Sequence, residues 1–259
     1  MAAEEHQDSL TLTPLRGVPL IAPGDDLADV IVRALTATKM TLQPRDVLIL
    51  AQKIVSKAEG RSVALSTVTP SPRAIELAKA TQKDPRVVEL ILSESTEVIR
   101  RRPGAIIVAH RLGYVLANAG IDQSNVEHGG DEHALLLPAD PDKSCRDLRA
   151  ALRERTGIDV AVLIIDSFGR AWRNRTVGTA IGVSGFPGLL DLRGKPDLFG
   201  RALQITEVGL ADELAAAASL LMGQAKEGQP VVLARGVPYE RRESSIQELI
   251  RPKAQDLFR

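Results

Sequence analysis

The run Val160 to Ile165 constrains the fold more than any other part of this 259-residue chain. Its six consecutive residues, VAVLII, are all apolar and mostly β-branched. Such a run is typical of a strand that is buried on both faces of a sheet. The run ends at Asp166, so a carboxylate stands where this strand is expected to reach the edge of its sheet. The fold must therefore enclose a central strand that presents an acidic group at one end.

A second aspartate occupies a similar place in another segment. Asp122 follows the apolar stretch Leu112 to Ala119, and Arg170, Arg173 and Arg175 come shortly after Asp166. Two carboxylates on rigid elements suit Mg²⁺ or Mn²⁺, which keep open positions for phosphate oxygens. Guanidinium groups match phosphate or carboxylate oxygens. We interpret the segments as a metal and phosphate site, and the competing interpretation is that both aspartates only cap turns.

The remaining pattern mixes helices with hairpins. Helical spacing or capping signals predict helices from Asp26, from Pro72 and from Pro85, and over 143–156 and 211–222. Extended runs predict strands over 46–51, 160–165, 176–183, 203–208 and 231–234, and a hairpin over 105–120. A polar loop is expected around Gln52, Lys53, Ser56 and Lys57. This irregular order favours an α+β fold, and residues 1–259 show no repeat or linker that divides them into domains.

Composition excludes several classes of partner. Thirty-three basic and 33 acidic residues balance, and aromatic residues make up only 3% of the chain, which argues against nucleic acid and anionic membranes. No apolar leader or membrane-spanning run is visible. Cys145 is the only cysteine, which fits the reducing cytoplasm. His110, His128 and His133 lack the paired spacing of a zinc site. We therefore expect a cytoplasmic protein that binds small molecules.

A nucleotide site, if present, must be of an uncommon type, because the chain has neither a P-loop nor a dinucleotide-binding glycine motif. Lys57 could neutralise a phosphate, and Gln52 and Lys53 could reach a base, a ribose or a phosphate. The alternative is that these are solvated surface side chains. The polar segment Met222 to Pro230 has a similar ambiguity, because it also fits an ordinary loop that ends a helix.

Seven segments, taken in order, resemble the coenzyme F420-0:L-glutamate ligases, a family of GTP-dependent γ-glutamyl ligases of F420 biosynthesis. They are GVPLI, AQKIVSKAEG, LANAGIDQSN, LLPADPD, DSFGRAWRNRTVGTAIGVSG, ADELAAAASLLMG and VVLARG. They span nearly the whole chain. The resemblance implies an intertwined homodimer of α+β fold, with mixed, largely antiparallel sheets packed against helices.

The resemblance also implies a reaction and its site. The carboxylate of coenzyme F420-0 would be joined to the amine of L-glutamate through an acyl phosphate, with GTP as co-substrate, and further glutamates would be added through γ-linkages. Two divalent ions, Mg²⁺ or Mn²⁺, are implied, with K⁺ as a further ion. The matching GTP-binding positions are Val18, Pro19, Leu20, Ile21, Gln52, Lys53, Lys57, Asn125, Met222, Gly223, Gln224, Ala225, Lys226, Glu227, Gly228 and Gln229. The matching metal ligands are Asp122, Asp166, Ser167 and Gln224, and the two aspartates are the catalytic residues.

Gln224 departs from the glutamate that some relatives have at this position. A neutral amide oxygen binds a hard divalent ion more weakly than a carboxylate does, so we expect weaker binding of the second ion. Arg170, Arg173 or Arg175 could hold the carboxylates of glutamate or the phosphodiester of F420. Two other functions remain open at this point: a metal-dependent phosphohydrolase or phosphotransferase, and a nucleotide-binding module without turnover.

Overall fold

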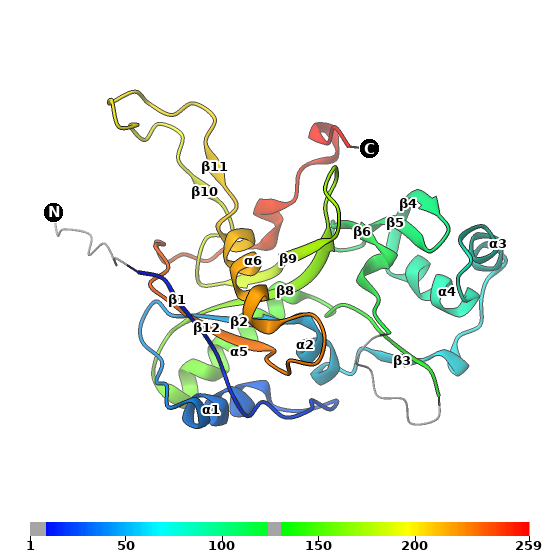
Figure 1. Ribbon diagram of the computed structural model, residues 1–259, viewed down its shortest axis with the longest axis horizontal. Helices are drawn as coiled ribbons and strands as arrows, with labels where there is room; N and C mark the ends of the chain where they lie inside the picture. Colours follow the sequence, from blue (N-terminus) through cyan, green and yellow to red (C-terminus); the bar gives the residue numbers. More distant parts are fainter. Residues whose placement is uncertain (1–8, 124–130, 259) are drawn as a thin grey trace.

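The computed structural model describes residues 9–123 and 131–258, which contain six α-helices and twelve β-strands (Figure 1). The helices are α1 (Leu27–Thr38), α2 (Gln52–Ala58), α3 (Pro72–Thr81), α4 (Pro85–Ser93), α5 (Pro141–Thr156) and α6 (Leu210–Met222). The strands are β1 (Thr11–Pro14), β2 (Val47–Ala51), β3 (Ser62–Ala64), β4 (Ser95–Arg102), β5 (Ala105–His110), β6 (Val115–Ala117), β7 (His133–Leu135), β8 (Ala161–Gly169), β9 (Thr176–Ser184), β10 (Leu190–Asp191), β11 (Glu207–Val208) and β12 (Val231–Arg235).

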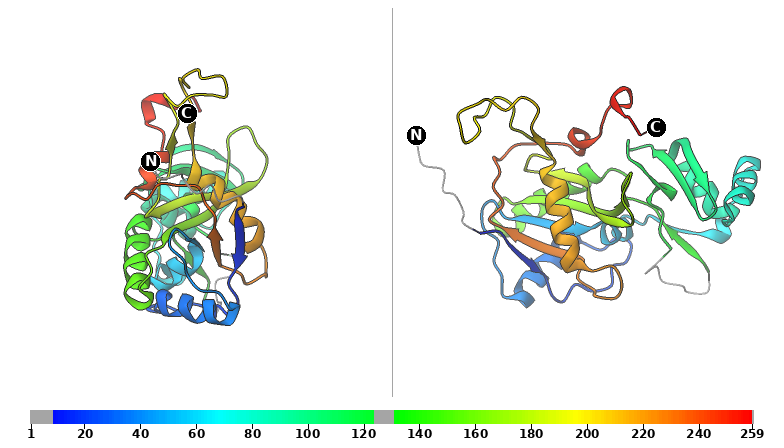
Figure 2. Two further views of the ribbon diagram at one scale, coloured as in Figure 1. Left: turned by 90° about the vertical axis from the view of Figure 1, so that its left-hand side faces the viewer. Right: turned by 45° about the horizontal axis from the view of Figure 1, so that its top comes forward.

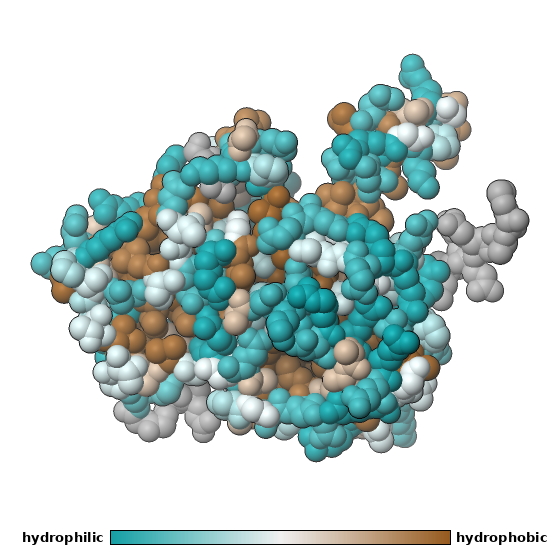
Figure 3. All heavy atoms as spheres, turned by 180° about the vertical axis from the view of Figure 1, so that it is seen from behind, coloured by the Kyte–Doolittle hydropathy of each residue, from teal (hydrophilic) through white to brown (hydrophobic). Residues whose placement is uncertain are grey.

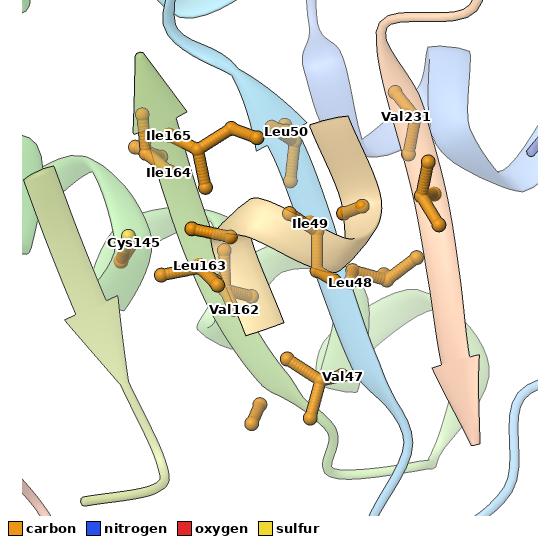
Figure 4. Packing of buried hydrophobic residues seen from close by; sticks show 14 of the residues in the cluster. Val47, Leu48, Ile49, Leu50, Cys145, Val162, Leu163, Ile164, Ile165 and Val231 are labelled. Atoms are coloured by element: carbon orange, nitrogen blue, oxygen red, sulfur yellow. The ribbon is translucent and has the colours of Figure 1, made fainter. Parts of the chain in front are cut away.

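A five-stranded sheet of order β1-β12-β2-β8-β9 forms the centre of the molecule. Only β2 and β8 pair in parallel, and the other neighbours pair antiparallel. β2 and β8 lie inside this sheet and contribute side chains that solvent barely reaches, among them Leu48, Ile49, Leu163 and Ile164 (Figure 4). The apolar run at residues 160–165 is therefore a central buried strand, as its sequence predicts.

Helices cover both faces of this sheet. α5 and α1 pack on one face and α6 crosses the other, so that the sheet lies between two helical layers (Figure 2). Two glycines of β9 allow this close packing. A Cβ at Gly178 would lie 2.5 Å from the carbonyl oxygen of Ala215 in α6, and one at Gly182 would lie 2.6 Å from the carbonyl oxygen of Pro141 in α5. Side chains at these two positions would push the helices off the sheet.

The segment between β3 and β7 builds a second lobe with its own apolar cluster. α3 and α4 pack against the three-stranded sheet β4-β5-β6, and buried residues such as Leu65, Ile91 and Ile106 fill the space between them. Two chain crossings join the lobes, and they are paired as the short antiparallel ribbon β3-β7. The view in Figure 1 shows this lobe to the right of the central sheet.

A long hairpin projects from the first lobe, and we call residues 190–208 the arm. β10 and β11 pair at its base, and backbone hydrogen bonds continue outward to the pair Asp197 and Arg201. Figures 1 and 3 show the arm standing clear of the body. Leu198, Phe199 and Ile205 on this arm are each more than 85% exposed. Most of the arm therefore lacks any core of its own to pack against.

The structure confirms the predicted α+β class and most of the predicted elements. Asp26, Ser71 and Asp84 cap the helices that were predicted to begin beside them. The hairpin over 105–120 is confirmed as β5 and β6. No helix in the described part of the chain has the length and hydrophobicity needed to cross a membrane.

Two expectations were wrong, and one strand was not predicted. The polar loop predicted at 52–57 is helix α2, because its polar residues occupy i and i+4 positions of one helical turn. Of the predicted strand 203–208, only Glu207–Val208 is a strand, and it pairs with β10 at the base of the arm. Strand β4 was missed, because this edge strand is mostly exposed and rich in arginine and so lacks an apolar alternation.

Candidate active site

Asp166 lies where its neighbouring strand stops. β2 ends at Ala51, which pairs with Ile165, and the chain then turns into α2. β8 continues beyond this point to Gly169, so Asp166 stands inside the strand rather than at its end, which corrects the sequence prediction. The end of β2 leaves this side of β8 open to side chains from α2. The strand end that was predicted at Asp166 is therefore the end of β2, the parallel neighbour of β8.

α2 delivers the charged partner of the second aspartate. The ammonium of Lys53, in the first turn of α2, lies 2.6 Å from Oδ2 of Asp122. Lys57 stands one turn further on the same side of the helix, since residues four apart share a helical face. Lys53 was predicted to bind the nucleotide, and its ion pair with Asp122 was not predicted. A helical reading of 52–58 would have placed Lys53 and Lys57 together.

Asp166 belongs to the same electrostatic group. Burial, together with the negative charge of Asp122, raises the pKa of the Asp166 carboxyl to about 6, while the amide of Ser167 and the charge of Lys53 oppose this shift. The structure thus brings the two predicted aspartates together with Lys53 between the two lobes. The two carboxylates lie close enough for the charge of Asp122 to raise the pKa of Asp166, an arrangement that a divalent cation can bind.

The backbone before Asp122 is held in an uncommon conformation. Asn118, Ala119 and Gly120 have consecutive positive φ angles of 53°, 54° and 68°. Oδ1 of Asn118 accepts a hydrogen bond from the backbone amide of Ile106 at 3.2 Å, and Asp122 exchanges two backbone hydrogen bonds with Leu135. Left-handed alanine costs about 1–2 kcal/mol and persists only where the surroundings fix it. This turn therefore determines where Asp122 emerges from the second lobe.

Ser167 and Gln224 form a second polar group on the other face of β8. The hydroxyl of Ser167 donates a hydrogen bond of 2.9 Å to Oε1 of Gln224, which follows the end of α6. Consecutive strand residues point to opposite faces, so the side chains of Asp166 and Ser167 leave β8 in opposite directions. The four predicted metal ligands therefore divide into two groups of two across this strand.

The donor atoms of both groups fit hard divalent cations. Carboxylate, hydroxyl and amide oxygens are the ligands that Mg²⁺ and Mn²⁺ prefer. Among the described residues, no three His, Cys, Asp or Glu side chains gather into a metal centre. Two carboxylates per ion, with phosphate oxygens and water completing the shell, match the way Mg²⁺ binds nucleotide substrates. Asp122 and Asp166 would hold one ion, and Ser167 and Gln224 fit the weaker second one.

The predicted nucleotide-binding segments surround α2. The backbone amide of Ala51 donates to the carbonyl oxygen of Pro230 at 2.8 Å, which sets the segment Met222 to Gln229 beside the start of the helix. The amide of Gly24 donates to the carbonyl oxygen of Ala58, so the segment Val18 to Ile21 approaches the opposite end of α2. Leu20 in that segment is 92% exposed.

Gln52 differs from the other predicted contacts, because it is buried and its Oε1 accepts a hydrogen bond of 2.8 Å from Ser56. Gln52 therefore stabilises α2 from the buried side of this helix. Glu227 folds back over its own segment and accepts a hydrogen bond from the amide of Ala225. Asn125 lies outside the described residues.

The three arginines lie away from the aspartates. Arg170, Arg173 and Arg175 are exposed at the tip of the β8-β9 hairpin, beyond Gly169. Arg170 is four residues along an extended strand from Asp166, a separation of roughly 13 Å. Within one copy of the chain, the structure therefore places them at a distance from the paired carboxylates.

Comparison with known proteins identifies the family. The family model described as F420-0:Gamma-glutamyl ligase matches residues 17–236. A protein of Methanothermobacter thermautotrophicus named coenzyme F420:L-glutamate ligase is 46% identical over 252 residues, covering 96% of this chain and 99% of the relative. Proteins of the same name from Methanopyrus kandleri and Archaeoglobus fulgidus are 49% and 42% identical, covering 93% and 95% of this chain and 96% and 95% of the relatives. The chain therefore belongs to the F420-0:gamma-glutamyl ligase family.

Proposed function

We propose that this protein is a GTP-dependent ligase that joins L-glutamate to coenzyme F420-0 through an acyl phosphate and then adds γ-linked glutamates. The observation that carries this proposal is the group formed by Asp122, Asp166 and Lys53, which α2, β8 and the turn after β6 bring together. The family membership and the relatives' name support the substrates. The cytoplasm is the proposed location, because the single cysteine, Cys145, is buried and unpaired, as suits a reducing compartment.

The chemistry requires activation before condensation. A carboxylate does not accept an amine at neutral pH, so the γ-phosphate of GTP would first be transferred to the F420-0 carboxylate. In phosphoryl transfer the protein mainly positions the reactants and stabilises charge. When bound at Asp122 and Asp166, a divalent ion would neutralise the transferring phosphate. Lys53 and Lys57 would bind phosphate oxygens from α2, and the segments Val18 to Ile21 and Met222 to Gln229 would enclose the nucleotide.

Mass spectrometry of the products tests this proposal. The purified protein is incubated with coenzyme F420-0, GTP, L-glutamate and Mn²⁺ or Mg²⁺. We expect the mass of F420-0 to rise in steps of one glutamyl unit, and GTP to be consumed only when both other substrates are present. Hydrolysis of GTP with unchanged F420-0 would instead indicate a phosphohydrolase, and GTP binding without any turnover would indicate a nucleotide-binding module.

We further propose that the protein is a homodimer, as the resemblance implies, and that its two copies assemble through the arm. An isolated two-stranded hairpin is at best marginally stable in water, and large exposed apolar side chains on a projecting segment usually mark an interface. Leu198, Phe199 and Ile205 give the arm this character, and Figure 3 shows apolar patches among its polar residues. A second copy of the chain would cover them.

Replacing Leu198 and Phe199 together by serine should convert the dimer into a monomer without unfolding the body, because the arm contributes little to either core. Light scattering coupled to size-exclusion chromatography measures the change. Leu257→Ser, at an equally exposed position outside the arm, serves as the control and should leave the mass unchanged. A wild-type protein that is monomeric at all accessible concentrations, or a double variant that stays dimeric, would refute the role of the arm.

A further inference from the structure

A small pocket lies at the outer edge of β9, and nothing in the family comparison assigns it a role. Its volume is about 230 Å³. Phe168, Tyr114 and Ile250 contribute apolar walls, and Thr179, Asp212, Arg251 and Asp256 contribute polar groups. The volume is below the roughly 300–1,000 Å³ of pockets for drug-sized ligands, so it suits a molecule of the size of an amino acid.

The pocket adjoins the aspartate site through the β8-β9 pair. Asp166 and Thr179 are direct cross-strand partners, so their side chains lie on the same face of the sheet. The next amide along β9, that of Ala180, donates a hydrogen bond of 2.9 Å to Oδ1 of Asp212. Three distances lead from the Cα of Asp166 to Oδ1 of Asp212: the Cα–Cα separation across the strand pair, the step from the Cα of Thr179 to the nitrogen of Ala180, and the hydrogen bond. Together they place Oδ1 of Asp212 at most roughly 11 Å from the Cα of Asp166. Because Asp212 extends from α6 on the opposite face of the sheet, an acyl phosphate bound beside Asp166 would meet a ligand in this pocket at Thr179, at the outer edge of β9.

The charged groups of the pocket are two carboxyls, Asp212 and Asp256, and one guanidinium. Arg251 lies at the rim, with its guanidinium 5.6 Å from the centroid of the Phe258 ring, and can bind a carboxylate, while the carboxyl of Asp212 is partly buried and can bind an amine. We propose that this pocket binds the amine substrate, an α-amino dicarboxylic acid such as L-glutamate, and that Asp212 accepts a proton from its amine. This inference rests on the proposed ligase function.

The α-ammonium of glutamate gives one proton to the Asp212 carboxylate, and the nitrogen lone pair attacks the acyl carbon of the acyl phosphate. The C–N bond forms while the bond between the acyl carbon and the oxygen of the phosphate group breaks. Inorganic phosphate leaves with the electron pair of that bond. The second nitrogen proton passes to the leaving phosphate. Asp212 then returns its proton to solvent.

The environment of Asp212 suits this task. Burial raises the pKa of the Asp212 carboxyl, although the hydrogen bond from the Ala180 amide opposes the shift. A carboxylate with a raised pKa accepts a proton more readily than an ordinary surface aspartate does. Position in the first turn of α6 fixes the backbone of Asp212, and the hydrogen bond from β9 fixes its side chain.

A comparison of two nucleophiles tests the inference. Hydroxylamine is largely unprotonated at neutral pH, so it can trap the acyl phosphate as a hydroxamate without a base. Asp212→Asn keeps an oxygen that can accept from the Ala180 amide, but it removes the basic carboxylate. We expect this variant to lose about 10²–10⁴-fold in the rate of glutamyl product formation while forming the F420-0 hydroxamate at the wild-type rate. Glu213→Gln, at the neighbouring exposed residue of α6, is the matched control and should retain both activities.

Two further variants test binding in case Asp212→Asn destabilises the protein. Arg251→Gln, and Val115→Trp at the exposed rim of the pocket, should each raise the KM for glutamate about tenfold or more without changing the KM for GTP. Equal loss of both products in Asp212→Asn, or an unchanged KM for glutamate in both rim variants, would overturn the inference. A wild-type protein that forms neither glutamyl product nor hydroxamate would instead refute the ligase function on which it rests.

Discussion

The Asp166→Asn variant should form glutamyl product about 10³-fold more slowly than the wild-type protein, a loss of several kcal/mol of transition-state stabilisation. Asparagine keeps the shape of the side chain but removes the negative charge that would bind a divalent ion opposite the transferring phosphate. Asp122→Asn should cause a similar loss, because Asp122 is the other carboxylate of the group and pairs with Lys53. Steady-state turnover of F420-0 at saturating GTP, glutamate and Mn²⁺ measures the effect.

These variants should remain folded. The raised pKa of Asp166 shows that its charged form is disfavoured by burial, so removing the charge should leave the melting temperature unchanged or higher. Asp147→Asn, at an exposed residue of α5 that pairs with Lys143, is the control and should have wild-type activity. Near-normal turnover in both Asp122→Asn and Asp166→Asn would remove the paired carboxylates from the mechanism.

The Glu94→Ala variant should lose about 1–3 kcal/mol of unfolding free energy, because it removes a buried carboxylate and leaves the partly buried guanidinium of Arg61 without its partner. Glu94 is 8% exposed, and its carboxylate lies 2.9 Å from the guanidinium of Arg61 and 3.0 Å from that of Arg111. The same two arginines donate to the carbonyl oxygens of Leu137 and Ala139. The cluster of Glu94, Arg61 and Arg111 therefore connects the second lobe to the two segments that join the lobes. Urea denaturation measures its contribution to the free energy of unfolding.

This contribution should depend on pH in a defined direction. Burial raises the pKa of Glu94, but His110 and Arg61 lower it by more, and the net value is about 2. A carboxyl whose pKa is lower in the folded protein stabilises the fold above its unfolded pKa of about 4.3, and this stabilisation is lost as the pH falls toward 2. The difference in stability between wild type and Glu94→Gln should therefore shrink across that range. Glu97→Gln, an exposed neighbour, should change stability by less than about 1 kcal/mol at any pH.

The sequence predicts the central elements of the fold because local signals specify them. The β-branched run at 160–165, the aspartate and serine caps and the glycine after α5 each act within a few residues, and each is confirmed. The class of fold follows from their order. β4 could not be predicted in this way, because its stability comes from pairing with β5 rather than from its own exposed, arginine-rich side chains.

The site was only partly visible in the sequence for the same reason. Asp122 and Asp166 were predicted to belong to one metal and phosphate site, and the structure brings them together with Lys53. Their separation from Ser167 and Gln224 depends on the strand extending past Asp166, which the sequence pattern placed at its end. The ion pair of Lys53 and the pocket beside Asp212 arise from contacts between segments far apart in the chain, which no local pattern encodes.

An acyl phosphate would leave an isotopic signature in the phosphate that the reaction releases. Coenzyme F420-0 with both oxygens of its reacting carboxylate labelled with ¹⁸O is converted with unlabelled GTP and L-glutamate, and the released phosphate is analysed by mass spectrometry. Transfer of the γ-phosphate to the F420-0 carboxylate predicts one ¹⁸O atom in the phosphate released with the first glutamate and one in the new amide, whereas phosphate released by later additions carries no label. Mono-glutamyl product formed with only unlabelled phosphate would be the opposite result, because water rather than the substrate carboxylate would then have taken the γ-phosphate.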